Sequence, residues 1–238
     1  MRLGIIGGLG PMATAYFMGL IINMTDARCD QDHLEMIIYD FPSIPDRTSF
    51  ILGKSEDNPV IPMIEIGKQL EAQKADNIAV PCITAHYFYE SLTENIKIPI
   101  INVIKETVMY LKEKGISTAG IAATDGTIYA NLFQKELMAQ GISYVIPSVI
   151  NQKYVMDLVY KDIKAGLPPE IFKFESISKE LRENGAEVII LGCTELSLIK
   201  RDYKVRGRYI DAMEVLARSS ILSCHGLLKK EYEDLITG

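Results

Sequence analysis

Short apolar runs alternate with amphipathic stretches along most of the chain. The runs are rich in isoleucine and valine and contain few polar residues, which is typical of strands that are buried on both faces of a parallel sheet. They are Leu3–Ile6, Glu35–Tyr39, Ile78–Pro81, Ile98–Val103, Thr118–Ala122, Tyr144–Ile146 and Val188–Leu191. This pattern predicts strands that are covered by helices on both sides.

The segments between these runs show helical periodicity. Several of them end at a glycine, such as Gly115, Gly141 or Gly185, the residue type that most often follows a helix. The predicted helices are Met12–Asn23, Pro62–Gln73, Lys105–Lys114, Ile128–Gln140, Ile171–Asn184 and a last one at Ile210–Leu228. Strands that alternate with helices predict an α/β fold with parallel sheets.

Two sequence landmarks recur in the same order. GIIGGLGPMAT, which starts at residue 4, resembles AGIAATDGTIYA, which starts 115 positions later at residue 119. AVPCITAH resembles IILGCTEL, and their cysteines, Cys82 and Cys193, are 111 positions apart. Nearly equal offsets indicate duplication of an α/β unit. We expect two similar lobes with a cleft between them: a first lobe of residues 1–98 plus 206–238 and a second lobe of residues 99–205, with hinges near 98 and 205.

Composition and charge exclude several classes of function. The formal net charge of −6 is spread over mixed signs without blocks, so a nucleic-acid partner is not expected. Residues 1–10 lack the pattern of a signal peptide, and no run of eighteen apolar residues occurs. We therefore expect a cytoplasmic protein without membrane association. The four cysteines are widely spaced, which predicts neither disulfides nor a zinc site.

Cys82 and Cys193 each follow a predicted strand, where ligands bind in open parallel sheets. A single buried cysteine more often fills space than reacts, but the matched placement of these two favours catalysis. Two thiols on opposite walls of a cleft suit the inversion of a stereocentre, because one removes a proton from one face while the other delivers a proton to the other face. Cys29 and Cys224 have no such matched setting, so we expect them to be structural.

Five motifs occur in order over nearly the whole chain: GGLGPMAT, PSIPDRT at 42–48, PCITAH at 81–86, ATDGT at 123–127 and GCTEL at 192–196. Together they resemble the aspartate/glutamate racemase family. The resemblance implies two Rossmann-like lobes related by pseudo-twofold symmetry with the active site between them, and usually a homodimer. It also implies an isomerase that racemises an acidic amino acid without a cofactor or a metal; aspartate is the expected substrate and glutamate the alternative.

The resemblance also implies roles for individual residues. Cys82 and Cys193 exchange the roles of base and acid. Arg47 receives the side-chain carboxylate of the substrate, which its planar fork suits, and Lys164 faces the same carboxylate. The remaining predicted substrate-binding residues line the pocket: Met12, Ile83, Thr84, Thr124 and Thr194.

Ile83 departs from the family pattern, which has asparagine at this position. An isoleucine cannot form hydrogen bonds, so the site loses a contact worth about 1.5–3 kcal/mol when the partner is charged. We expect weaker activity or altered substrate choice. Glu195 and His86, which follow the two cysteines, either tune the thiols or serve capping and packing roles.

Two other functions compete with racemisation. Gly8, Gly10 and Ala13 fit the loose dinucleotide fingerprint of an NAD-dependent enzyme. However, the acidic residue that ends the next strand, Asp40, lies thirty residues past Gly10 rather than about twenty. The second alternative is a non-catalytic protein whose lobes clamp an acidic amino acid, but such a protein does not need two thiols.

Overall fold

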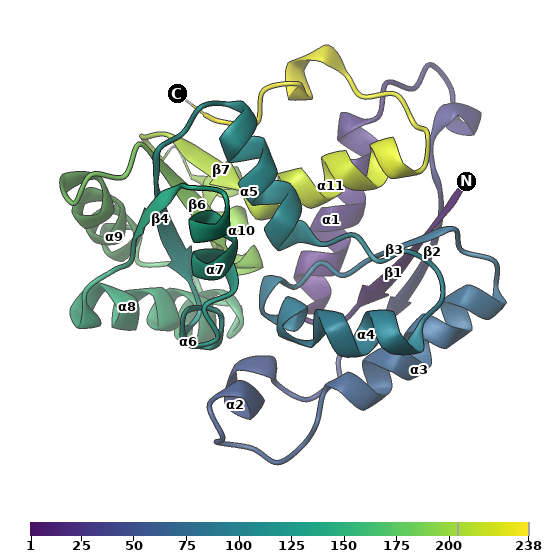
Figure 1. Ribbon diagram of the computed structural model, residues 1–238, viewed down its shortest axis with the longest axis horizontal. Helices are drawn as coiled ribbons and strands as arrows, with labels where there is room; N and C mark the ends of the chain where they lie inside the picture. Colours follow the sequence, from purple (N-terminus) through teal and green to yellow (C-terminus); the bar gives the residue numbers. More distant parts are fainter. Residues whose placement is uncertain (204, 238) are drawn as a thin grey trace.

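Two parallel β-sheets form the centres of two lobes in the computed structural model, which describes residues 1–203 and 205–237 (Figure 1). The first sheet, in the order β2-β1-β3, consists of β1 (Arg2–Gly7), β2 (Glu35–Asp40) and β3 (Asn77–Ala79). The second sheet, in the order β5-β4-β6-β7, consists of β4 (Thr118–Ala123), β5 (Ser143–Val145), β6 (Val188–Gly192) and β7 (Tyr209–Asp211). The predicted α/β fold with two helix-flanked parallel sheets is confirmed.

Helices flank both sheets. Those before β4 are α1 (Pro11–Met24), η1 (Asp30–Asp32), α2 (Arg47–Ile51), α3 (Val60–Ala72), η2 (Ile83–Phe88), α4 (Tyr89–Asn95) and α5 (Val103–Glu113). Those that follow are α6 (Asp125–Tyr129), α7 (Leu132–Ala139), α8 (Val149–Met156), the π-helix η3 (Asp157–Ile163), α9 (Ile171–Glu183), α10 (Thr194–Asp202), α11 (Ala212–Ser223) and η4 (Lys230–Tyr232).

The two sheets share a strand order. β1 lies between β2 and β3 just as β4 lies between β5 and β6, and all these pairs are parallel. In the second sheet, β7 pairs with β6. At the corresponding position beside β3, the first sheet has a single parallel bridge, between Ile78 and Ile100. The predicted strand Ile98–Val103 is therefore wrong. Pro99 has no N–H to donate, and Asn102 already caps α5 by accepting a bond from the N–H of Lys105 at 3.1 Å.

Two predicted helices have different bounds in the structure. Ile128–Gln140 is divided into α6 and α7, because Asn131 adopts a left-handed conformation with φ of 56°. The segment Ile210–Leu228 begins as strand β7 and becomes helical only at Ala212. β7 pairs with the second sheet although it lies in the range predicted for the first lobe. The lobe boundaries at 98 and 206 remain predictions, and Lys204 and Gly238 lie outside the described residues.

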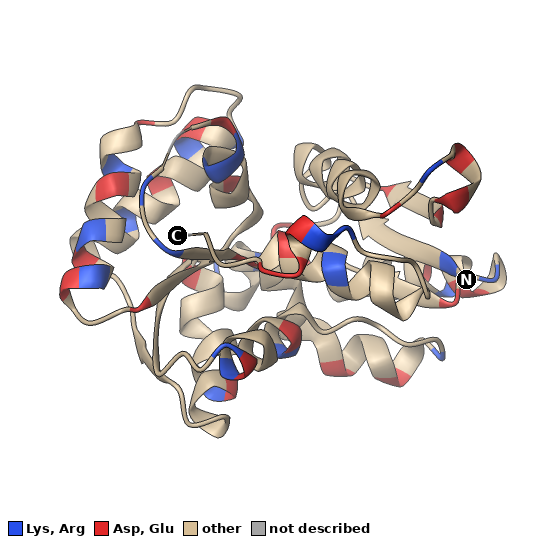
Figure 2. Ribbon diagram, turned by 90° about the horizontal axis from the view of Figure 1, so that it is seen from above, with Lys and Arg blue, Asp and Glu red and all other residues tan. Residues whose placement is uncertain are grey.

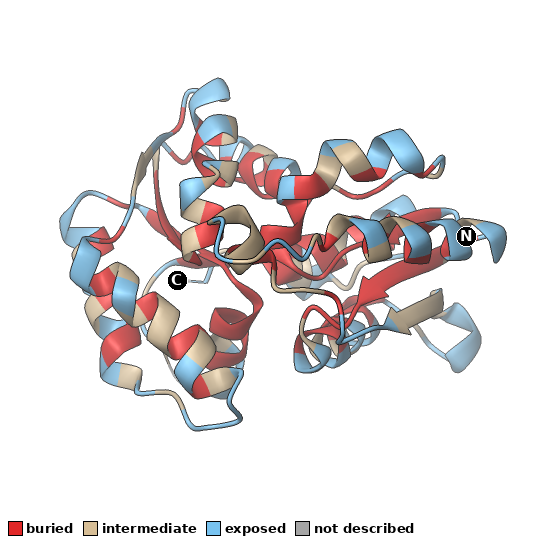
Figure 3. Ribbon diagram, turned by 90° about the horizontal axis from the view of Figure 1, so that it is seen from below, coloured by how far each residue is buried: buried red, intermediate tan, exposed pale blue. Residues whose placement is uncertain are grey.

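One continuous apolar core joins the lobes. Helices α1, α5 and α11 lie across the middle of the molecule, and α11 contacts β3 of the first sheet and β7 of the second (Figure 1). The core contains Ile5 and Phe17 from the first lobe together with Ile121 and Phe133 from the second. Figure 3 shows that the strands and the inward faces of the helices are buried while the outer turns are exposed. The lobes are thus joined by packing as well as by the chain.

Charged residues of both signs are scattered over the outer helices (Figure 2). This distribution agrees with the mixed charges along the sequence. Among residues 1–203 and 205–237, no helix combines the length and the apolar character that crossing a membrane requires.

The turn between β1 and α1 depends on a glycine that brings two loops together. Gly8 has φ of +85°, and its N–H donates to the hydroxyl of Thr14 at 2.9 Å. A Cβ atom at Gly8 would overlap the backbone N and C atoms of Phe41, which begins the loop leading to α2. Because the overlap is with backbone, neither a rotamer change nor a small side-chain shift can relieve it.

We predict that Gly8→Ala lowers the free energy of unfolding by about 2–4 kcal/mol, from the left-handed backbone conformation and the overlap together. Gly10→Ala in the same turn is the matched control, because a Cβ atom there meets nothing within 4 Å. It should change stability by only about 0.5 kcal/mol. Urea unfolding followed by circular dichroism measures both, and equal effects of the two variants would contradict the packing described.

Candidate functional site

Cys82 and Cys193 occupy equivalent positions in the two lobes. Cys193 directly follows β6 and precedes α10, whereas Cys82 follows β3 after two residues and precedes η2. Their backbones have nearly the same conformation, with φ and ψ of −149° and 109° at Cys82 and of −148° and 134° at Cys193. Both residues are buried. The duplicated strand ends therefore carry a matched pair of thiols.

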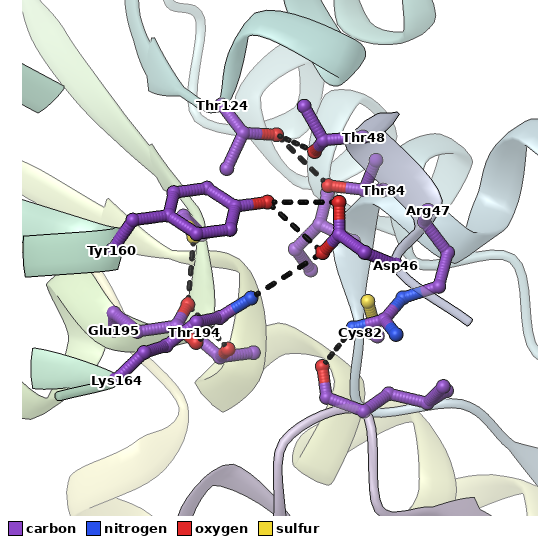
Figure 4. Close-up of a pocket in the computed structure, with 13 residues that line it drawn as sticks. Asp46, Arg47, Thr48, Cys82, Thr84, Thr124, Tyr160, Lys164, Thr194 and Glu195 are labelled. Carbon is purple, nitrogen blue, oxygen red and sulfur yellow. Dashed lines mark hydrogen bonds and ion pairs between the residues drawn. The ribbon is translucent and has the colours of Figure 1, made fainter. Parts of the chain in front are cut away.

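Both cysteines line one cavity between the lobes, here named the inner cavity (Figure 4). Its lining residues are Leu9, Asp46, Arg47, Thr48, Cys82, Ile83, Thr84, Thr124, Tyr160, Lys164, Cys193, Thr194 and Glu195. The free volume is about 10 Å³ for the centre of a water molecule, which is the room that a single water needs. The structure thus represents a closed state, and a larger ligand requires the lobes to part.

Cys193 is held as a thiol by its surroundings. Its S–H donates to Oε2 of Glu195 at 2.8 Å, and the hydroxyl of Thr194 donates to the same oxygen at 3.0 Å. Burial and the negative charge of Glu195 raise the pKa of Cys193 well above its ordinary value. Cys193 is therefore protonated in the closed state.

Cys82 lies beside the guanidinium group of Arg47 (Figure 4). Arg47 is only 7% exposed, and its Nη atoms donate to the carbonyl oxygens of Leu9 at 2.6 Å and Pro45 at 3.0 Å. Its Nε finds no hydrogen-bond partner among the residues that the structure describes. Burial lowers the pKa of Arg47, but the charges of Cys82 and Asp46 raise it more, so the net direction is upward. Arg47 thus places a permanent positive charge next to Cys82.

Asp46 connects the lobes across the mouth of the inner cavity. It caps α2 by accepting a bond from the N–H of Ser49 at 2.8 Å, and it accepts a second bond from the hydroxyl of Tyr160 at 3.1 Å. Burial opposes ionisation of Asp46, but the bond from Ser49 and the charges of Lys164 and Arg47 lower its pKa below the usual range. Asp46 is therefore a carboxylate at neutral pH.

Lys164 lies between two carboxylates. Its Nζ is 3.9 Å from Oδ2 of Asp46 in the first lobe and 3.8 Å from Oε1 of Glu195 in the second. It also lies 4.4 Å from the ring centre of Tyr160. Tyr160 lies within the π-helix η3, and Lys164 directly follows this helix. The N–H of Lys164 donates to the carbonyl oxygen of Val159. Irregular helices of this kind often occur at functional sites.

Threonine hydroxyls from both lobes meet on one wall. Thr84 of the first lobe lies 3.0 Å from the hydroxyls of both Thr124 and Thr127 of the second, and Thr48 lies 3.4 Å from Thr124. Thr124 also precedes α6 as its N-cap. These buried hydroxyls can turn toward an anion and donate to it. The wall therefore suits a carboxylate.

A larger outer cavity of about 350 Å³ adjoins the inner one and shares Leu9, Asp46, Arg47, Lys164 and Glu195 with it. Its remaining lining residues are Gly8, Gly10, Pro11, Met12, Ala13, Pro42, Ile44, Ile163 and Leu198. The turn with the loose dinucleotide fingerprint thus forms a wall of this cavity. The outer cavity therefore lies next to the cavity that holds the two thiols.

The structure brings together all the predicted site residues except one. Cys82, Cys193, Arg47, Ile83, Thr84, Thr124, Lys164 and Thr194 line the inner cavity, whereas Met12 is 64% exposed and lines only the outer one. Sequence reasoning missed Asp46 and Tyr160. Asp46 had a signal, since an aspartate just before a short helix is a typical cap. Tyr160 had none, because a π-helix has no recognisable pattern of its own.

Glu195 also lines the inner cavity, whereas His86, Cys29 and Cys224 do not. His86 is buried, with Nδ1 3.1 Å from the carbonyl oxygen of Cys82 and Nε2 3.3 Å from that of Ile101. Burial lowers its pKa, so it is neutral and supports the backbone of Cys82. All four cysteines are free thiols, with Cys29 exposed and Cys224 buried elsewhere. Over residues 1–203 and 205–237, no group of three or more histidine, cysteine, aspartate or glutamate side chains could hold a metal ion.

Known proteins resemble this chain over nearly its whole length. The family model of Asp/Glu/hydantoin racemases matches residues 6–219. The structure of Picrophilus torridus aspartate racemase is similar with a TM-score of 0.87 and 32% identity, covering 98% of this chain and 97% of that one. The Bacillus subtilis broad specificity amino-acid racemase RacX is 26% identical over 92% of this chain and 96% of its own.

The glutamate racemase of Aquifex pyrophilus shares the fold, with a TM-score of 0.62 at 21% identity over 92% of this chain and 82% of that one. The similarities agree with the motifs and with the two parallel sheets. The chain belongs to the Asp/Glu/hydantoin racemase family and is an isomerase.

Proposed function

We propose that the protein racemises an amino acid without a cofactor, by proton transfer between the substrate Cα and the thiols of Cys82 and Cys193. The observation that carries this proposal is that two thiols at equivalent strand ends line one closed cavity between the lobes. In one direction a thiolate removes the α-proton from one face while the other thiol protonates the opposite face. In the reverse direction the two groups exchange roles.

The surroundings of the thiols give each a starting role. Cys193, kept protonated by burial and by Glu195, is the acid of the closed state. Arg47 supplies a positive countercharge beside Cys82 when that sulfur is negative. Catalysis then starts with Cys82 as base and Cys193 as acid. The opposite enantiomer requires the opposite protonation of the pair.

The threonine wall and the closed cavity support the reaction at the α-carbon. Removal of the α-proton places negative charge on the α-carboxylate, and donors fixed in advance stabilise such charge best when water is excluded. The hydroxyls of Thr84, Thr124 and Thr194 and the N-terminus of α10 provide these donors. Closure of the lobes over the substrate excludes water.

Aspartate is the first substrate to test, with glutamate as the alternative. The family resemblance supports acidic substrates, and the 32% identical relative is named an aspartate racemase. The name of the Bacillus relative, a broad specificity amino-acid racemase, supports a wider range. A cytoplasmic homodimer is also part of the proposal, and sedimentation at micromolar concentration tests the dimer.

We predict that L-aspartate or L-glutamate loses optical rotation and gains α-deuterium when incubated with the protein in deuterium oxide without added cofactor. Cys82→Ser and Cys193→Ser should each slow racemisation at least about a hundredfold, because a serine hydroxyl is a far weaker acid and base partner than a thiol. Chiral chromatography and proton NMR measure the two changes.

Cys29→Ser is the matched control, because it makes the same substitution at an exposed site outside the cavity; it should retain full activity. A non-catalytic binding protein would show thermal stabilisation by the amino acid with no deuterium exchange. An NAD-dependent enzyme would be stabilised by NAD. Either result would contradict the proposed reaction.

We also predict that Glu195→Gln shifts the pH profile of Cys193 alkylation to lower pH. The glutamate charge raises the pKa of Cys193, so its removal favours the thiolate and speeds alkylation at a given pH below the plateau. Peptide mass spectrometry after timed iodoacetamide treatment follows Cys193 separately from the other cysteines. Glu175→Gln on the exposed face of α9 is the control, and an unchanged profile in Glu195→Gln would refute the role of this carboxylate.

A further inference from the structure

We propose that Tyr160 is a positioning residue whose hydroxyl group, through its bond to Asp46, holds the inner cavity closed over the two thiols. The role of this bond rests on the proposed function, because a substrate must reach the thiols before it can react. The inner cavity has room for a single water molecule, so no amino acid fits in the closed state. The contacts that keep the cavity closed must therefore break whenever a substrate molecule enters.

The part of the first lobe that closes the cavity is the short helix α2. Asp46 caps this helix, and Arg47 and Thr48 are its first two residues; all three line the inner cavity. Figure 1 shows α2 near α6 and away from the first sheet, and α2 contacts α6 of the second lobe. A Cβ atom at Gly126 of α6 would lie only 3.0 Å from Cα of Thr48. The start of α2 thus packs directly against the second lobe.

Three polar contacts between residues 46–48 and the second lobe occur in the part of the chain that the structure describes. The hydroxyl of Tyr160 donates to Oδ2 of Asp46 at 3.1 Å. The hydroxyls of Thr48 and Thr124 are 3.4 Å apart, and Nζ of Lys164 lies 3.9 Å from Oδ2 of Asp46. An ion pair of that length between partly exposed side chains contributes little. The bond from Tyr160 is the shortest of the three, and its charged acceptor makes it the strongest.

Tyr160 keeps its proton in this setting. Burial and the negative charge of Asp46 raise the pKa of Tyr160, so the phenol remains a donor at neutral pH. The pKa of Asp46 is lowered despite its burial, so the acceptor is charged. The same carboxylate accepts the N–H of Ser49 at 2.8 Å, which ties it to the backbone of α2. The bond from Tyr160 therefore holds the whole start of α2, including Arg47 beside Cys82.

Opening of the cavity can be measured through the thiols themselves. Cys82 and Cys193 are only 7% and 6% exposed, and iodoacetamide is far larger than the water-sized space beside them. Alkylation therefore proceeds through the open state, and its rate follows the fraction of molecules that are open. A bond made only in the closed state lowers that fraction. Because one opening exposes both thiols, loss of the bond should raise both rates by the same factor.

Tyr160→Phe removes the hydroxyl and keeps the ring, whose centre lies 4.4 Å from Nζ of Lys164. We expect the alkylation rates of Cys82 and Cys193 without ligand to rise together by about tenfold, as expected for the loss of a hydrogen bond to a charged acceptor. Timed iodoacetamide treatment followed by peptide mass spectrometry measures each cysteine separately. Tyr154→Phe on α8 is the matched control, because this half-buried tyrosine does not line the cavity; it should change neither rate.

Cys224 reports on the rest of the molecule. It is 5% exposed and lines neither the inner nor the outer cavity, so its alkylation rate should not change in Tyr160→Phe. A rise at only one of Cys82 and Cys193, or by clearly different factors, would indicate altered thiol reactivity rather than opening. An equal rise at all three cysteines would indicate a general loss of stability. Either pattern, or unchanged rates, would overturn the proposed role of Tyr160.

Asp46→Ser tests whether Tyr160 acts through Asp46. Serine still caps a helix well, but its side chain is one bond shorter and carries no charge. In the Asp46→Ser background, we expect Tyr160→Phe to change the two alkylation rates less than twofold, because the partner is already gone. A larger effect in this background would overturn the assignment. None of these rates depends on racemisation, so a failure of the proposed function, seen as absent α-deuterium exchange, remains distinguishable.

Discussion

The apolar core that runs between the two sheets is the constraint on which the site depends. α1, α5 and α11 pack together with side chains of both lobes, and this packing sets the relation between two strand ends that are far apart in the sequence. Neither cysteine has a matched partner within its own lobe. The pair exists only because the core brings the end of β6 to the end of the segment after β3.

The seam between the lobes is closed by polar bonds rather than by further apolar packing. Asp46 bonds to Tyr160, Lys164 lies between carboxylates of both lobes, and threonine hydroxyls meet across the gap. Polar contacts of this kind can exchange with water or with a ligand at small net cost, whereas an apolar core cannot. The molecule thus has an apolar connection on one side and a polar seam on the other.

Charge in the closed cavity has large effects because water is nearly absent. The same low-dielectric surroundings keep Cys193 protonated and make any unpaired charge on a substrate expensive. The protonation of Cys193 and the charges of the cavity are therefore linked through the same few groups. Glu195 illustrates the link, since its carboxylate both bonds to Cys193 and neutralises Lys164.

The sequence alone determined the α/β class, the duplication and the positions of the two cysteines. Buried parallel strands produce uninterrupted runs of isoleucine and valine, and strand ends such as those at Cys82 and Cys193 follow directly from these runs. The bounds of short elements were less predictable: Pro99 reduced an expected strand to one bridge, and Asn131 divided an expected helix. Only the tertiary structure decided that Asp46 and Tyr160 meet, that Arg47 donates to the backbone carbonyls of Leu9 and Pro45, and that Lys164 lies between two carboxylates. These features depend on distances between residues that are remote along the chain, and no local propensity or periodicity encodes such distances.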